Sequence, residues 1–135
     1  MVILLDTSFL YIIFNKSDPH NERGIKILNE IEKLKYGQPI ITDYIFDELL
    51  TLTLNKLGKS FALKVLNGLI ELLNNGLELF FINEDLFEKA VECFIKYELS
   101  FTDCTSVALL LAEKESYIAS LDKGFDRVKG IVRIY

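Results

Sequence analysis

Short apolar runs separated by stretches of helical length constrain the fold of this chain most. Most of these runs are continuously apolar, as in strands that are covered on both faces. Strands that alternate with helices form βαβ units and a parallel sheet. The pattern therefore predicts an α/β fold, a three-layer α/β/α sandwich with a five-stranded parallel sheet. The expected strands are Val2–Leu5, Pro39–Thr42, Leu77–Ile82, Tyr117–Leu121 and Ile131–Ile134.

Cap and turn residues predict where the helices begin and end. Asp18 and Pro19 predict a helix start, as N-cap and first helical residue, and this helix would run to about Tyr36. Gly37 would then end it, and Ser60 could cap a later helix. The other expected helices are about 43–56, about 60–74, about 84–97 and about 102–115.

Bulk properties favour one cytoplasmic domain over residues 1–135. No linker divides the chain and no repeat is evident. The apolar runs are shorter than the roughly 18 residues that a membrane span needs, and the N-terminus lacks the features of a signal peptide. Cys93 and Cys104 fit neither a CxxC motif nor a disulfide framework, so we expect two reduced, partly buried thiols.

The charge distribution leaves one local question open. A net charge of −5 argues against a non-specific nucleic-acid coat protein. The stretch 122–135 is nevertheless locally basic, which fits either a solvated face of mixed charge or a rim that attracts phosphate. Its basic residues are Lys123, Arg127, Lys129 and Arg133, and the first three are candidates for contacts with backbone phosphates.

Four acidic residues lie where a charge is costly unless something pairs with it: Asp6, Glu48, Asp103 and Asp122. Asp6 and Asp122 follow predicted strands, and open parallel sheets bind ligands beyond the carboxyl ends of their strands. Glu48 and Asp103 lie in or beside apolar helical stripes, whereas Asp47 would face solvent. We therefore expect the four acids to reach the same edge of the sheet.

Each acid also has an ordinary structural explanation. Asp6 could cap a helix, and Glu48 could cover apolar surface with its stem while its head reaches water. Asp103 could belong to an N-terminal capping box with Ser100, and Asp122 could form a turn. These alternatives stay open for each residue taken alone.

Converging carboxylates would repel one another unless they bound a cation. Oxygen ligands favour hard ions, so Mg²⁺ or Mn²⁺ is the expected occupant. Ser8 and Ser120, together with Thr7, could offer hydroxyls to a metal-bound water or a phosphate. Other chemistries have little support, because the one histidine, His20, is expected on the surface and no phosphate-binding glycine loop exists.

Two other functions compete with metal-dependent hydrolysis. A Mg²⁺-dependent phospho-acceptor or phosphatase domain also places an Asp after its first strand. A receiver-type domain needs a further Asp after the third strand, where this chain has Phe80 to Asn83. The third hypothesis is a catalytically silent binding module.

Four segments resemble the PIN-domain nucleases, particularly the short VapC-type toxins of toxin–antitoxin pairs. The resemblance covers essentially the whole chain, and its specificity comes from the four segments occurring in this order. Gly124 stands where many members carry an acidic or polar residue, and Cys104 replaces a common alanine. The segments are Leu5–Ser8, Ile41–Glu48, Leu99–Asp103 and Ser120–Phe125.

This resemblance implies a metal-dependent endoribonuclease that leaves 5′-phosphate and 3′-hydroxyl ends. The four acids match the acidic positions of the family, and Ser8 matches a hydroxyl beside the first acid. A homodimer and a small antitoxin partner are also implied. In our hypothesis three acids ligate Mg²⁺, while Glu48 holds a second ion or orients the attacking water. The apolar segment Phe9–Phe14 could form part of a protein interface.

Overall fold

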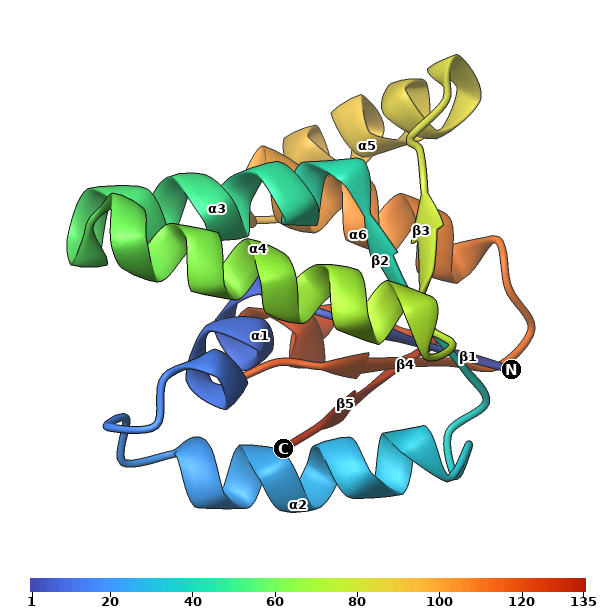
Figure 1. Ribbon diagram of the computed structural model, residues 1–135. Coiled ribbons are helices and arrows are strands. Elements are labelled where there is room, and N and C mark those ends of the chain that lie inside the picture. The colour runs from blue at the N-terminus through green and yellow to red at the C-terminus, as the bar shows by residue number, and fades with distance from the viewer.

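A computed structural model describes all residues, Met1–Tyr135, and confirms the expected α/β architecture with a five-stranded parallel sheet. The strands are β1 (Val2–Leu5), β2 (Gln38–Thr42), β3 (Glu78–Phe80), β4 (Ser116–Ala119) and β5 (Ile131–Ile134). The helices are α1 (Thr7–Phe14), α2 (Asn21–Glu32), α3 (Asp43–Leu57), α4 (Lys59–Asn74), α5 (Glu84–Lys96) and α6 (Phe101–Leu111), with a 3-10 helix η1 (Lys123–Arg127). In Figure 1, α3 and α4 lie together on one side of the sheet and α2 lies on the other.

The strand order is β3-β2-β1-β4-β5, so the chain builds outward from β1 in one direction and then returns to build in the other. β1 lies at the centre, where Leu4 pairs with Ile40 of β2 and with Ile118 of β4. The order in which strands are added therefore reverses between β1 and β4. Open α/β sheets form a ligand crevice at such a point. Asp6 and Asp122 follow these two strands.

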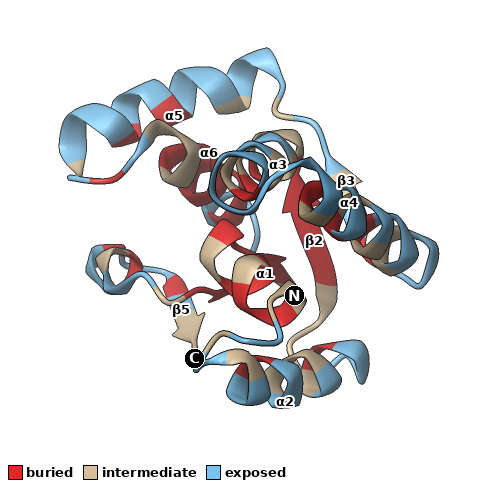
Figure 2. Ribbon diagram, turned by 60° about the vertical axis from the view of Figure 1, so that its left-hand side comes forward, coloured by how far each residue is buried: buried red, intermediate tan, exposed pale blue.

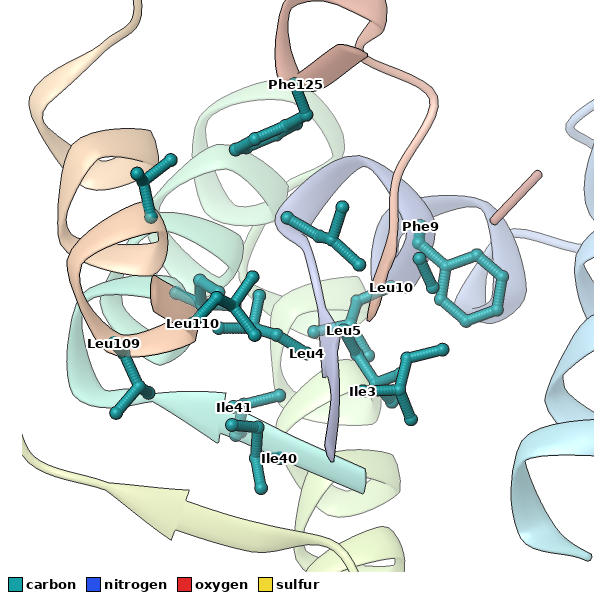
Figure 3. Packing of buried hydrophobic residues seen from close by; sticks show 14 of the residues in the cluster. Ile3, Leu4, Leu5, Phe9, Leu10, Ile40, Ile41, Leu109, Leu110 and Phe125 are labelled. Carbon is teal, nitrogen blue, oxygen red and sulfur yellow. The ribbon is translucent and has the colours of Figure 1, made fainter. Parts of the chain in front are cut away.

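The core forms around β1, whose residues Ile3, Leu4 and Leu5 are almost completely buried. Figure 3 shows them packed among side chains from β2, α1 and α6. The continuous apolar runs of the central strands are therefore explained by cover on both faces. Figure 2 shows the contrast with α5 and β3, which are largely exposed.

Helix α1 is apolar nearly all round because it is part of this core. Phe9, Leu10, Ile12 and Ile13 are buried, which leaves only the half-buried Tyr11 and Phe14 to meet a partner within the expected interface segment. Exposed large apolar side chains occur on several elements, α3 and α4 among them, and α5 carries four. Those of α5 are Phe87, Val91, Phe94 and Ile95. None of the helices is both long enough and apolar enough to cross a bilayer.

The predicted bounds of α2 are wrong at both ends. Asp18 does not cap the helix, because its Oδ1 accepts the N–H of His20 (2.8 Å) in a turn and α2 begins only at Asn21. The helix ends at Glu32, and Leu34 then adopts a φ of 59°. Gly37 has a φ of 85° and lets the carbonyl oxygen of Met1 approach to 2.2 Å from where a Cβ would stand. A side chain there would therefore separate the starts of β1 and β2.

Other boundaries also differ from the prediction, and β4 spans Ser116–Ala119 instead of Tyr117–Leu121. Ser60 is not a cap, since α4 begins at Lys59 with Gly58 as its N-cap. β3 is shorter than Leu77–Ile82, because the N–H of Leu77 bonds back to the carbonyl of Leu72 and that of Ile82 to the Asp43 carboxylate. The ends of this apolar run are thus held by partners outside the sheet rather than by the neighbouring strand. α6 ends at Leu111, before the expected Glu115.

Candidate active site

Asp6 is a buried carboxylate at the carboxyl end of β1. It occupies the N-cap position of α1, yet its side chain makes no capping hydrogen bond, so the cap explanation is wrong for this residue. Its Oδ2 accepts hydrogen bonds from Ser8 Oγ (3.0 Å) and from Ser120 Oγ (2.6 Å). Side chains from both sides of the crevice therefore hold one carboxylate oxygen.

The two serine hydroxyls are themselves fixed by the backbone that follows β4. Ser8 Oγ accepts the N–H of Leu121 (3.0 Å), and Ser120 Oγ accepts the N–H of Asp122 (3.0 Å). A hydroxyl has one proton to donate, and both contacts with Asp6 have the geometry of that donation. Ser8 and Ser120 therefore orient Asp6, and their protons are not directed at an incoming phosphate.

The second oxygen of Asp6 is in a different position. Oδ1 accepts no hydrogen bond from a side chain. It is also not among the buried side-chain atoms that lack a partner, because Thr7 Oγ1 is the only such atom in the structure. Asp6 Oδ1 consequently keeps access to solvent although the residue as a whole is buried. Burial raises the pKa of Asp6, the hydrogen bonds from Ser120, Ser8 and the Thr7 backbone oppose this, and the charge of Glu48 raises the pKa further.

Asp103 shows that the four acids share one electrostatic environment. The Asp103 N–H donates to Ser100 Oγ (3.1 Å), so Ser100 caps α6 as expected. Burial is the main cause that raises the pKa of the Asp103 carboxyl to about 7, and the charges of Asp6, Asp122 and Glu48 add to it against an opposing hydrogen bond from Ser100. Asp103 therefore follows the Ser100 cap and also lies near enough to the other three acids for their charges to raise its pKa.

Asp122 is exposed and forms the turn that its place before Lys123-Gly124 predicts. Its Oδ1 accepts the N–H of Gly124 (2.8 Å), which caps η1. The charge of Asp122 nevertheless reaches Asp103, as the raised pKa of Asp103 shows. One oxygen of Asp122 is thus engaged locally.

Glu48 lies half-buried on α3, on the flank of a stripe formed by the fully buried Ile45 and Leu49. Its neighbour Asp47 is exposed and receives a weak hydrogen bond from Thr51 (3.4 Å). The helical period therefore separated the two acids correctly. A shallow hollow beside Glu48 is lined also by Asp47, Thr51, Leu52, Asn55, Lys56 and Thr102.

None of the four acids forms an ion pair with a cationic side chain. The three ion pairs of the structure engage other carboxylates: Lys26–Glu22, Lys35–Glu30 and Arg133–Asp126. Uncompensated oxygen donors suit a hard divalent cation. No three His, Cys, Asp or Glu side chains are close enough to form a closed metal-binding group, however, so binding an ion would need these side chains to draw together.

The remaining predicted residues lie around this site in different roles. Lys123, Arg127 and Lys129 are exposed and take part in no ion pair, whereas Arg133 is bound to Asp126. Sequence reasoning placed Arg133 among the surface cations, and only its position between Val132 and Ile134 on an expected strand set it apart. His20 is exposed and contacts the Tyr135 hydroxyl (2.5 Å). Cys93 and Cys104 are buried free thiols.

Similarity to known structures confirms the fold. The VapC20 toxin of Mycobacterium tuberculosis, described as cleaving the sarcin-ricin loop, superimposes with a TM-score of 0.78 at 22% identity and 92% coverage of both chains. The VapBC2 structure from Rickettsia felis, bound to a promoter DNA fragment, gives a TM-score of 0.71 at 16% identity, covering 99% of this chain and 98% of that one.

Sequence comparison identifies the family. The VapC ribonuclease of Archaeoglobus fulgidus is 29% identical over 116 residues, which are 84% of this chain and 72% of that protein. The model of the PIN domain family matches residues 3–131 and so spans the whole site, from Asp6 to Asp122. The chain therefore belongs to the PIN domain family.

Proposed function

We propose that this protein is an endoribonuclease that uses Mg²⁺ or Mn²⁺ to hydrolyse RNA phosphodiester bonds. The observation that carries the proposal is the shared acidic environment. Burial and the charges of Asp6, Asp122 and Glu48 raise the pKa of Asp103 to about 7, and none of the four acids forms an ion pair. Similarity to a VapC ribonuclease supports RNA as the substrate.

Asp6, Asp103 and Asp122 would hold the ion, and Glu48 would hold a second ion or orient water. A bound divalent ion supplies stabilisation of negative charge on the phosphate and lowers the pKa of water. Ser8 and Ser120 keep the Asp6 carboxylate oriented, with Oδ1 left available. Asp103 must release its proton before it can act as an anionic ligand. No histidine is required in this scheme.

Substrate and partners form the second part of the proposal. Lys123, Arg127 and Lys129 would contact the backbone phosphates of RNA and position it beside the acids. The expected products carry 5′-phosphate and 3′-hydroxyl ends. Similarity to VapBC assemblies supports a small antitoxin as partner of a cytoplasmic toxin. The exposed apolar side chains of α5 support a homodimer, because such surface favours protein contacts.

Neighbouring acids on α3 provide a matched test. Glu48→Gln should lower Mn²⁺-dependent cleavage of single-stranded RNA by about 10- to 100-fold, the loss typical for groups that support a metal site. Asp47→Asn removes the same charge from the exposed neighbour and should change the rate less than about twofold, as for surface positions. Cleavage is measured with purified protein, with and without a chelator.

Two results would contradict the proposal. Cleavage that persists undiminished in chelator would exclude metal dependence. Equal loss in the Glu48 and Asp47 variants would show that general charge, rather than the position of Glu48, controls the rate.

A further inference from the structure

Arg133 makes a more constrained set of contacts than any other basic residue of the chain. Its Nε and Nη2 donate to Asp126 Oδ1 (2.9 Å) and Oδ2 (3.1 Å), and its Nη1 donates to the main-chain carbonyl of Ser120 (3.1 Å). Its side chain is only 15% exposed. The two-point contact with Asp126 fixes the plane of the guanidinium, so the third N–H has one direction.

That third contact falls on a residue that matters to the site. The N–H of Ser120 donates to the carbonyl of Ile134 (3.3 Å), so two consecutive residues of β5 hold both backbone groups of Ser120. The hydroxyl of Ser120 is then placed 2.6 Å from Asp6 Oδ2 and accepts the N–H of Asp122. A hydrogen-bonded path therefore connects Asp126, through Arg133 and Ser120, to Asp6.

We propose that Arg133 is a positioning residue for the Asp6 carboxylate. By fixing the Ser120 backbone it keeps the Ser120 hydroxyl on Oδ2 and leaves Oδ1 without a side-chain hydrogen bond. Nε, Nη1 and Nη2 of Arg133 all donate to Asp126 or Ser120, and in this role the side chain binds neither RNA nor ion. This role rests on the proposed metal-dependent function, in which Asp6 is a ligand.

The direction in which divalent-ion affinity changes when Arg133 is neutralised distinguishes a positioning role from a purely electrostatic one. The hydrogen bonds to Asp126 are the main cause that raises the pKa of the Arg133 guanidinium, and the nearby charge of Asp122 adds to it. If Arg133 acted only as a nearby cation, its neutralisation would reduce repulsion and strengthen the binding of a divalent ion. If it positions Ser120, the same substitution would weaken binding.

The experiment compares Arg133→Gln with Arg23→Gln in the full chain, with Mn²⁺ affinity measured by calorimetry. Arg23 lies over the ring of Tyr135 (4.3 Å), so its substitution removes an equal charge and loosens the end of the same strand without touching Ser120. We expect Arg133→Gln to weaken Mn²⁺ binding about tenfold, as for groups that hold metal ligands in place. Arg23→Gln should leave it within about twofold. Arg133→Lys restores the charge but not the two-point contact, and should not restore affinity.

Amide hydrogen exchange gives a second readout that needs no metal. Arg133→Gln should accelerate exchange at Leu121 and Asp122, whose N–H groups donate to the serine hydroxyls, relative to amides of β1 in the same molecule. Unchanged or tighter Mn²⁺ binding by Arg133→Gln overturns the positioning role. If the wild-type chain itself binds no Mn²⁺, the proposed function fails, and the exchange data then decide Arg133: equal rates in variant and wild type overturn its role, and local acceleration supports it.

Discussion

Two surfaces of this molecule are incomplete in different ways. The acidic edge, made of Asp6, Glu48, Asp103 and Asp122, includes carboxylates held by hydrogen bonds, at Asp6 and Asp122, but none of its four acids is in an ion pair. The aromatic patch is made of Phe101 and the exposed Phe87 and Phe94, whose ring centroids lie 5.2 and 6.2 Å from that of Phe101, and it lacks cover.

The difference between the two surfaces indicates what each would bind. Oriented oxygens with unbalanced charge are completed by a small cation, because the attraction depends on position. Exposed aromatic rings are completed by another protein surface, because the gain depends on the apolar area that is covered. Substitutions at the acidic edge should therefore change stability through lost hydrogen bonds and with pH. Substitutions at the aromatic patch should instead change the association of the protein with a partner.

The largest expected stability effect is at the acidic edge. Ser120→Ala removes the donor to Asp6 and the acceptor of the Asp122 N–H, both in a buried position. It should lower the free energy of unfolding by about 1–3 kcal/mol, the cost of leaving a buried polar group unpaired. Urea titration in chelator measures this. Ser17→Ala, which removes an exposed bond to Asn15, is the matched control, and an equal loss in both variants would show that the Ser120 bonds add nothing.

A smaller effect should follow pH. Between its ordinary pKa of 3.8 and its folded pKa of about 7, Asp103 binds a proton that the unfolded chain has released. Its contribution to stability is therefore complete below the lower value and is lost as pH rises through the upper one. Asp103→Asn should leave the metal-free protein more stable than wild type near pH 8 and little changed near pH 4.

Thermal unfolding in chelator at the two pH values measures this difference. Asp126→Asn provides a control of opposite sign, because Arg133 lowers the pKa of Asp126 and the variant should lose stability at the higher pH. A pH-independent difference between Asp103→Asn and wild type would contradict the assignment of a raised pKa.

The smallest effect on stability is expected at the aromatic patch. Phe94 is 53% exposed, so Phe94→Ser should change the free energy of unfolding by no more than about 0.5 kcal/mol. If the patch mediates the proposed homodimer, the same substitution should lower the average mass in sedimentation equilibrium. Lys96→Ser, an exposed change on the same helix, is the control. Unchanged association in Phe94→Ser would place the interface elsewhere.

Much of the candidate site could be predicted from local pattern. Continuous apolar runs identified the central strands, and parallel strands end at one edge, so Asp6 and Asp122 had to lie near each other. The helical period separated the half-buried Glu48 from the exposed Asp47. The cap preference of serine located the start of α6 at Ser100.

Boundaries were less predictable where local signals compete. Asp18 carried the features of a helix cap, but its side chain closed a turn two residues on. The run from Leu77 to Ile82 predicted one strand, yet the N–H groups at both of its ends donate hydrogen bonds to partners outside the sheet. Propensity describes what a segment can form, and the available hydrogen-bond partners decide where it stops.

The sequence by itself determined the order of the layers and which acids stand at the strand ends, because both follow from periods of a few residues. Only the tertiary structure decided that Ser120 lies on Asp6 across 114 positions of chain, and that Arg133 holds Ser120 instead of facing solvent. The physical reason is the distance along the chain over which each of these signals acts. Burial patterns repeat along the chain, whereas a hydrogen bond between distant residues depends on where the packed elements bring their side chains.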